Sequence, residues 1–256
     1  MYNSPIGIFD SGIGGITILN SIKNLLPNES IIYYSDNLNS PYGNKSKIEI
    51  EKLSFKNTEF LINKGCKIIV VACNTATTNS IKKLRANFNI PFIGVEPAIK
   101  PAAIKTKSGL IGVLATEGTL SSVVFSKTSN ANSLNVNIIE KNAEGLVELI
   151  EKGIFHGEKI EEILKKYLTP MIEKKIDYLV LGCTHYPILI NTIKSIIPNT
   201  IKIIDNGKAV ALQTKRILKK NQIENSSLEL KYLFYCNGSP MSLNKILNNK
   251  FTVNKV

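Results

Sequence analysis

The chain of 256 residues is 43% hydrophobic and 20% charged, and its formal net charge is +12. This composition is typical of a globular protein, and the length suffices for two units of about 100–150 residues each. Only Arg85 and Arg216 are arginine among the 32 basic residues, and the lysines are scattered. Since arginine is favoured for phosphate and base-edge contacts, we expect no nucleic-acid partner. No apolar run approaches the ~20 residues of a membrane span, which predicts a cytoplasmic protein without membrane contact.

Short apolar runs alternate with amphipathic stretches along the chain. The runs that we expect to form strands are residues 6–9, 31–35, 68–72, 91–95, 110–114, 136–140, 178–182 and 201–204. The clearest helical stripe between them consists of Ile160, Ile163, Leu164, Tyr167, Leu168 and Met171. This alternation predicts an α/β fold with parallel sheets that carry helices on both faces.

The two halves of this pattern match each other at a nearly constant offset. Gly7 corresponds to Gly112 at a shift of 105 residues, and Cys73 corresponds to Cys183 at a shift of 110. Any α/β chain repeats its elements at some interval, but the matched cysteines favour an internal duplication. The sequence therefore predicts two pseudo-symmetric, doubly wound domains with parallel-rich sheets and an active site in the cleft between them.

The domain boundaries follow from the repeat. Residues 1–95 and 209–256 are expected to form the first α/β domain, and residues 96–208 the second. The C-terminal stretch contains a further apolar run, residues 232–235, which has no counterpart in the repeat. We expect this run to pack back onto the first domain.

Cys73 and Cys183 each follow an apolar run and precede a hydroxyl-rich turn. Open α/β sheets bind ligands just past the carboxyl ends of their strands. One thiol from each half suits the removal of a proton from one face of a carbon atom and its return to the other face. One sulfur would act as thiolate and the other as thiol, because neighbouring charges or N–H groups readily lower the cysteine pKa of about 8.5. Cys66 and Cys236 lack the polar follow-on and are interpreted as structural.

Two further groups are placed to assist the thiols. Asp10 is the only carboxylate directly after the first strand, and His185 lies two residues past Cys183. If the backbone stays extended there, His185 projects to the same side as Cys183. Asp10 near Cys73 and His185 near Cys183 would give each thiol its own partner. A helix N-cap is the alternative for Asp10, and a backbone-bonded structural residue is the alternative for His185.

Polar residues after the strands are candidates for holding a small anionic substrate. Asn74, Thr75 and Thr184, with the backbone N–H groups around them, are suited to bind a carboxylate. Tyr42 and Gly43 belong to a loop after the second strand and could bind the far end of the substrate through backbone N–H groups. A plain turn explains that loop equally well.

Other chemistries leave weaker traces in the sequence. Gly12 and Gly14 follow the first strand and Asp36 follows the second, as in NAD-linked oxidoreductases, but Thr17 occupies the third glycine position. No lysine stands in a context that singles it out for pyridoxal phosphate, and too few ligands cluster at metal spacing for a zinc site. We therefore expect neither cofactor nor metal, and we keep an NAD-linked oxidoreductase as the alternative from another class.

Six stretches carry a family resemblance: residues 7–15 (GIFDSGIGG), 40–43 (SPYG), 72–77 (ACNTAT), 94–97 (GVEP), 112–119 (GVLATEGT) and 181–187 (LGCTHYP). Together they resemble the glutamate racemases of the cofactor-independent aspartate/glutamate racemase family. The resemblance runs from residue 6 to about 207, and residues 234–238 are similar to a closing family motif. The cysteine motifs are common to several racemases, whereas Asp-Ser-Gly and Pro-Tyr-Gly are more specific to the glutamate enzymes.

The resemblance implies interconversion of L- and D-glutamate, which supplies D-glutamate for peptidoglycan, cell-wall biogenesis and cell shape, by a protein that forms a homodimer. It implies Cys73 and Cys183 as the acid/base thiols, with Asp10 and His185 assisting. The family carries a further acidic helper, which corresponds either to Glu151 or, less well, to its near neighbour Glu148.

The resemblance also implies how glutamate is held. The side-chain carboxylate would be bound by Ser11, Tyr42 and Gly43. Asp10 and His185 are expected to bind the substrate as well. The α-carboxylate would be bound by Asn74, Thr75 and Thr184. The chain departs from the family pattern at Asn39, Glu117 and Asn206, none of which is an expected catalytic group. A racemase that acts on aspartate or hydantoins is the alternative within the family.

Overall fold

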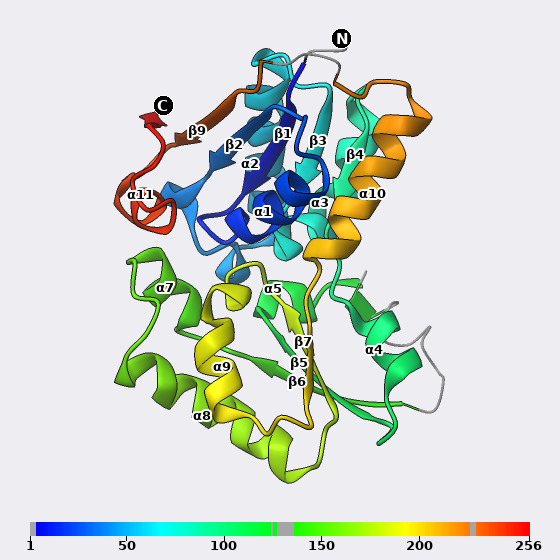
Figure 1. The fold of residues 1–256 in the computed structure, drawn as a ribbon, viewed down its shortest axis with the longest axis vertical. Helices are drawn as coiled ribbons and strands as arrows, with labels where there is room; N and C mark the ends of the chain where they lie inside the picture. Colours follow the sequence, from blue (N-terminus) through cyan, green and yellow to red (C-terminus); the bar gives the residue numbers. More distant parts are fainter. Residues whose placement is uncertain (1–3, 124, 127–135, 226–228) are drawn as a thin grey trace.

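The structure, a computed structural model, describes residues 4–123, 125–126, 136–225 and 229–256. It contains two separate β-sheets, which lie one above the other in Figure 1. Within the described residues, every strand pair in both sheets is parallel. Helices alternate with the strands along the chain. The expected α/β class with parallel sheets is therefore confirmed.

The first sheet draws on both ends of the chain. Its strands are β1 (Ile6–Asp10), β2 (Ile31–Ser35), β3 (Ile68–Val71), β4 (Phe92–Gly94), β9 (Tyr232–Cys236) and β10 (Val253–Lys255). The helices around it are α1 (Ile16–Leu25), α2 (Lys47–Asn63), α3 (Asn74–Asn87), α10 (Gly207–Lys220) and α11 (Met241–Ile246). Short 3₁₀ helices follow β2 at Asn37–Asn39 and Tyr42–Asn44. Helix α10 packs against α1, so the chain after residue 206 returns to the first sheet.

The second sheet is built from the middle of the chain. Its strands are β5 (Leu110–Ala115), β6 (Asn137–Asn142), β7 (Tyr178–Gly182) and β8 (Lys202–Ile204). Its helices are α4 (Ile99–Lys105), α5 (Glu117–Leu120), α7 (Leu146–Glu151), α8 (Glu158–Glu173) and α9 (Ile190–Ile196), with a 3₁₀ helix at Tyr186–Leu189. Among the described residues, no helix is both long enough and apolar enough to cross a membrane.

The strand order reproduces the predicted duplication. Neighbouring strands run β2-β1-β3-β4 in the first sheet and β6-β5-β7-β8 in the second, so each strand has a counterpart at the same place. The prediction for residues 232–235 is also confirmed, because β9 pairs with β2 in the first sheet. The last strand, β10, pairs with β9 at the edge of this sheet and was not anticipated.

The central strands explain why the sequence signal is strong. Strands β1, β2 and β3 are buried along their whole length, and strands buried on both faces read as continuous apolar runs rather than alternating ones. Cys183 directly follows β7, and Cys73 lies two residues past the end of β3. The duplicated architecture therefore delivers one thiol from each sheet.

A buried ion pair offers a test of the packing at the amino ends of the strands in the first sheet. Lys67 and Glu29, which precede β3 and β2, pair at 2.7 Å with side chains that are 1% and 4% exposed. Removing one partner leaves a buried charge without compensation, so we expect Lys67→Met to lower the free energy of unfolding by about 3–5 kcal/mol. Urea denaturation measures this change.

The matched control is Lys165→Met. Lys165 pairs with Glu161 at 3.5 Å, and the two side chains are 59% and 46% exposed. An exposed pair contributes about 0–1 kcal/mol, so this variant should unfold close to the wild-type midpoint. Equal losses for the two lysine variants would contradict the burial argument.

Candidate active site

Cys73 occupies the junction between β3 and α3. It is the N-cap residue of α3, and the Ala76 N–H donates to its Sγ at 3.4 Å. The Cys73 thiol donates to Ser11 Oγ at 3.5 Å, and the Ser11 hydroxyl donates to Asp10 Oδ1 at 3.1 Å. The thiol of the first half is therefore backed by a hydroxyl and then by a carboxylate.

Burial controls the protonation of this thiol. Cys73 is 5% exposed, and burial together with the nearby charge of Asp10 raises its pKa to about 12, against the opposing effect of the Ala76 N–H and the Ser11 hydroxyl. Burial also raises the pKa of the Asp10 carboxyl, although His185 and the Thr184 hydroxyl act in the other direction. At neutral pH Cys73 is consequently a thiol in this arrangement, the form that donates a proton.

Cys183 follows β7 in the second half and has different partners. Its Sγ lies 3.7 Å from His185 Nδ1, and His185 Nε2 lies 2.6 Å from Glu151 Oε1. Burial lowers the pKa of His185, but its hydrogen bonds to Cys183 and Glu151 outweigh burial, and the pKa is raised well above 6.5. The sulfur of the second half is therefore next to an imidazole, which in turn bonds to a carboxylate.

The structure distinguishes between the two candidate glutamates on α7. The carboxylate of Glu151, the last residue of the helix, bonds to His185.

The backbone at His185 differs from the sequence-based expectation, because it is helical (φ −74°, ψ −34°) rather than extended. The turn that begins there, and not the alternation of a strand, brings the imidazole to Cys183.

Both thiols line one cavity. Except for Asp10, its wall also contains the residues expected to bind substrate, namely Ser11, Tyr42, Gly43, Asn74, Thr75, Thr184 and His185. Asp10 and Glu151 lie behind this wall, where they bond to Ser11 and His185. The cavity volume is about 10 Å³, close to the minimum that can hold one water molecule. Acid/base groups from opposite halves thus face one small, partly enclosed space.

The carboxylate of Asp10 joins the two halves. Its Oδ2 accepts a hydrogen bond of 2.8 Å from the Thr184 hydroxyl, while Oδ1 accepts from the Gly12 N–H at 3.0 Å. Both side chains are buried. Asp10 therefore contacts Cys73 through Ser11 and also fixes the residue that follows Cys183.

The side chains of Tyr42 and Asn74, two predicted binding residues, differ in whether they are free to contact a ligand. The Tyr42 hydroxyl donates to Asp36 and accepts from Asn57 at 3.0 Å, so it is engaged within the protein. Contacts of this loop with a ligand would therefore use the backbone, as the sequence suggested. Asn74 donates to the Val95 carbonyl, whereas its buried Oδ1 has no hydrogen-bond partner among the described residues. That oxygen is free to accept a hydrogen bond from a ligand.

Sequence reasoning missed Thr116, which lines the cavity from the second half. Its hydroxyl lies 2.8 Å from Thr75 Oγ1 and 3.2 Å from Thr119 Oγ1, and Thr75 and Thr119 are 3.1 Å apart. The repeat contained the signal, because the offset of 105 residues places Thr116 opposite Ser11. Hydroxyls at equivalent strand ends therefore meet at the same cavity.

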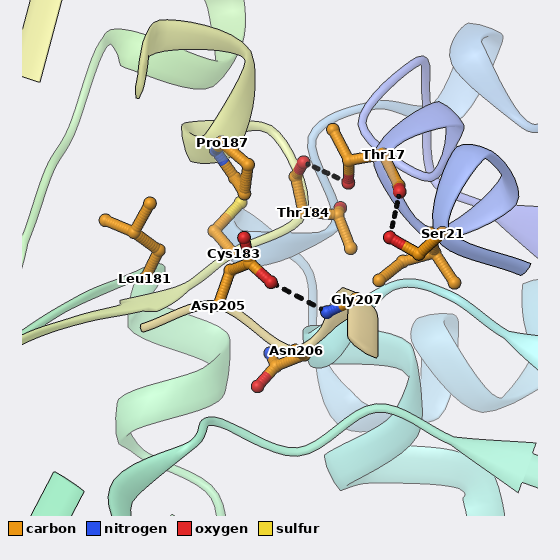
Figure 2. A pocket seen from close by; sticks show the side chains of 10 residues that line it. Thr17, Ser21, Leu181, Cys183, Thr184, Pro187, Asp205, Asn206 and Gly207 are labelled. Carbon is orange, nitrogen blue, oxygen red and sulfur yellow. Dashed lines mark hydrogen bonds between the residues drawn. The ribbon is translucent and has the colours of Figure 1, made fainter. Parts of the chain in front are cut away.

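A second hollow, of about 30 Å³, lies beside the first, and Cys183 and Thr184 line both. Figure 2 shows its wall. The Thr17 hydroxyl donates to the Thr184 carbonyl at 3.2 Å, and the Gly207 N–H donates to Asp205 Oδ1 at 2.9 Å. The Cys183 turn is thus held by α1 on one side and faces the start of α10 on the other.

The site geometry disfavours the alternative chemistries. Within the described ranges, no group of three or more His, Cys, Asp or Glu side chains could hold a metal ion. An ideal Cβ placed on Gly12 would stand 1.9 Å from Glu151 Oε1. The space that a dinucleotide pyrophosphate would need after β1 is therefore filled by a carboxylate. The arrangement supports proton transfer between two thiols better than it supports hydride transfer.

Comparison with known proteins agrees with this chemistry. Residues 14–214 match the family of Asp/Glu/Hydantoin racemases. The chain belongs to this family. The resemblance noted in the sequence is therefore confirmed. One similar protein is the glutamate racemase of Herpetosiphon aurantiacus. It is 44% identical to this chain, and the match covers 85% of this chain and 86% of the relative.

Two solved structures are also similar to this racemase-family chain. Escherichia coli glutamate racemase, in complex with L-glutamate and the activator UDP-MurNAc-Ala, has a TM-score of 0.87 at 32% identity and covers 99% of this chain and 98% of its own. Francisella tularensis glutamate racemase, in complex with D-glutamate, has a TM-score of 0.85 at 30% identity. That match covers 100% of this chain and 98% of the Francisella chain. The match to both extends over essentially the whole fold.

The pKa of His185 provides a test of the Cys183 side of the site. The chain has only two histidines, and the other, His156, is exposed and gives a reference signal. We expect the His185 imidazole to stay protonated well above pH 6.5 and Glu151→Gln to lower its pKa, because the variant removes a negative charge that favours the imidazolium. NMR titration of the ring nitrogens measures both values. An unchanged His185 titration in the variant would contradict the assigned contact.

Proposed function

We propose that this protein interconverts L- and D-glutamate and that Cys73 and Cys183 transfer the proton. Glutamate racemisation rests on the relatives, which are named glutamate racemases and match most of the chain, and on solved relatives that bind each enantiomer. The proton-transfer roles rest on one observation, the single cavity lined by both sulfurs, each with its own hydrogen-bonded partners.

The reaction needs a base on one face of the α-carbon and an acid on the other. In one direction the Cys183 thiolate takes the α-proton and becomes a thiol, and the electron pair left on carbon spreads into the α-carboxylate. The Cys73 thiol then gives its proton to the opposite face and becomes a thiolate. In the other direction the two sulfurs exchange roles. Asp10 and His185 assist the sulfur nearest to each, and Glu151 holds His185.

The start of α3 is suited to hold the α-carboxylate. Asn74 and Thr75 are the first residues of this 14-residue helix, and helix N-termini bind anions through free N–H groups and the helix dipole. The same groups stabilise the charge that develops on the α-carboxylate, which is the larger part of what such catalysis requires. Thr184 lies on the other side of the cavity and completes this subsite. Ser11, Tyr42 and Gly43 remain for the side-chain carboxylate.

Substrate entry requires the two halves to separate. A volume of about 10 Å³ holds one water, and glutamate is several times larger. We propose that the moving units are the predicted domains, residues 1–95 with 209–256 and residues 96–208. The two sheets support this division, since each domain would contain one of them. Closure then excludes water, which protects the carbanion from protonation by solvent.

The biological setting is proposed from the family resemblance. D-glutamate made by this enzyme would supply peptidoglycan synthesis, and the chain would act as a homodimer without a nucleic-acid partner. A cytoplasmic location fits the cysteines, since all four are free thiols in the structure, as proteins of reducing compartments require. Sedimentation of the purified protein measures the oligomeric state.

Replacing either cleft cysteine should sharply reduce racemisation. Positioned acid/base groups contribute ~10²–10⁴-fold, so we expect losses of that order for Cys73→Ser and for Cys183→Ser. The measurement is the change in optical rotation of L- and D-glutamate without added cofactor, together with the incorporation of solvent deuterium at the α-carbon. Wild-type turnover in both variants would exclude the two-thiol mechanism.

Cys66→Ser is the matched control, because Cys66 is a buried thiol that packs against Gly7, away from the cavity lining. It should retain racemisation at temperatures where it is folded. L-aspartate offered in place of glutamate should turn over poorly, and added NAD should change nothing. Faster turnover of aspartate than of glutamate would instead favour the alternative substrate within the family.

A further inference from the structure

The glycine-rich loop between β1 and α1 approaches the second half of the chain at very short range. An ideal Cβ on Gly12 would stand 1.9 Å from Glu151 Oε1, and one on Gly14 would stand 2.5 Å from His185 Nδ1. Neither glycine has a left-handed φ, so these positions require space rather than backbone freedom. The missing side chains let the loop touch the two residues that stand behind Cys183.

One peptide group of this loop bonds to Glu151. The Ile13 N–H donates to Glu151 Oε1 at 2.7 Å, and the same oxygen lies 2.6 Å from His185 Nε2. The amide belongs to the first half, whereas the carboxylate and the imidazole belong to the second. The contact that orients the carboxylate toward His185 is therefore made across the two halves.

A buried tyrosine beneath the loop holds the other end of that peptide group. Tyr33 on β2 is fully buried, and its hydroxyl donates to the Gly12 carbonyl at 2.6 Å. The Gly12 carbonyl and the Ile13 N–H belong to one peptide unit. Hydrogen bonds in such a chain polarise one another, so the tyrosine strengthens and orients the bond to Glu151. Gly15 permits this approach, because a Cβ there would lie 2.8 Å from the Tyr33 hydroxyl.

We infer that residues 12–15 and Tyr33 form a docking seat that positions the Glu151–His185 pair against Cys183 when the halves close. The inference rests on the proposed function and extends it. Tyr33 is a positioning residue: it acts on the sulfur through the Gly12–Ile13 peptide, Glu151 and His185. The seat also gives the glycine motif after β1 a role, since a carboxylate from the other half occupies the place where a nucleotide-binding loop would hold phosphate.

Through Tyr33 and Ile13 the seat acts on one sulfur. Glu151 and His185 lie on the Cys183 side, whereas Cys73 bonds to Ser11 and accepts from the Ala76 N–H. The Gly12 N–H belongs to the preceding peptide unit and donates to Asp10 on the Cys73 side, independently of Tyr33. Loosening the Tyr33 contact therefore slows the proton transfers of Cys183 and leaves those of Cys73 nearly unchanged. A change that slows one of the two proton transfers is visible in the primary deuterium isotope effect. The slowed transfer becomes more rate-limiting, so the isotope effect rises when the deuterium is removed in that step.

The test compares Tyr33→Phe with Tyr34→Phe. Tyr34 is the next residue of β2, also buried, and its ring packs on Phe60 with centroids 4.6 Å apart, on the face of the strand away from Tyr33. Each variant removes one hydroxyl from a buried ring. We expect Tyr33→Phe to reduce racemisation about 10-fold or more, since small misplacements of catalytic groups cost as much as ~10²-fold, and we expect Tyr34→Phe to retain the wild-type rate.

The deciding readout is the primary isotope effect of each α-deuterated enantiomer. In Tyr33→Phe it should rise for the enantiomer that Cys183 deprotonates and should not rise for the other. Cys183→Ala identifies that enantiomer, because the variant retains deuterium exchange only for the enantiomer that Cys73 deprotonates. Isotope effects that match wild type for both enantiomers, or that rise equally for both, would overturn the inference.

Gly12→Ala gives a second, independent variant. The added methyl meets the Glu151 carboxylate without straining the backbone, so it should displace the carboxylate and produce the same one-sided isotope effect. Thermal unfolding of each variant shows that the measured protein is folded. Failure of the wild type to racemise glutamate would reject the proposed function itself, whereas wild-type racemisation with symmetric effects in both variants would reject only the docking seat.

Discussion

The hydrogen bond between Asp10 and Thr184 is the contact on which the closed site depends. A carboxylate that is fully buried is costly unless donors surround it, and Asp10 has three: the Gly12 N–H, the Ser11 hydroxyl and the Thr184 hydroxyl. The third comes from the other half of the chain. Separation of the halves would remove this donor, and solvent would have to replace it. The closed arrangement is therefore favoured by the same group that stands behind one of the thiols.

A duplicated scaffold provides two equivalent positions, and the residues around them make those positions chemically different. Cys73 is backed by a serine hydroxyl and an aspartate, whereas Cys183 is backed by an imidazole and a glutamate. Burial and the charge of Asp10 favour the thiol form of Cys73, whereas an imidazole lies beside Cys183. The two sulfurs thus face one cavity in different electrostatic surroundings before any substrate arrives.

Much of this arrangement was predictable from the sequence, for identifiable reasons. Buried parallel strands are continuous apolar runs, so eight strands and the repeat could be located, and the repeat in turn paired Cys73 with Cys183. The family motifs then named most of the cavity wall. Strand β10 escaped notice because its three residues, Val253–Lys255, are partly or fully exposed at an edge and carry no apolar run.

Contacts between distant segments could not be predicted in the same way. Glu148 and Glu151 are one helical turn apart, and Glu151 is distinguished by its bonds to the Ile13 N–H and to His185, which belong to other segments of the chain. The sequence suggested backbone contacts for Tyr42, but it did not reveal that Asp36 and Asn57 engage the Tyr42 hydroxyl inside the protein. Periodicity reports the face of an element that is buried, whereas these pairings depend on how two separately folded sheets approach each other.

The unequal surroundings of the two sulfurs have a thermodynamic consequence. L- and D-glutamate are mirror images with the same free energy in water, so an enzyme that interconverts them has an equilibrium constant of one. The ratio kcat/KM must then be identical in the two directions, however different the thiols are. The two thiols have different partners, a hydroxyl and a carboxylate on one side and an imidazole and a carboxylate on the other. If this difference gives one enantiomer the lower KM, that enantiomer must also have the lower kcat.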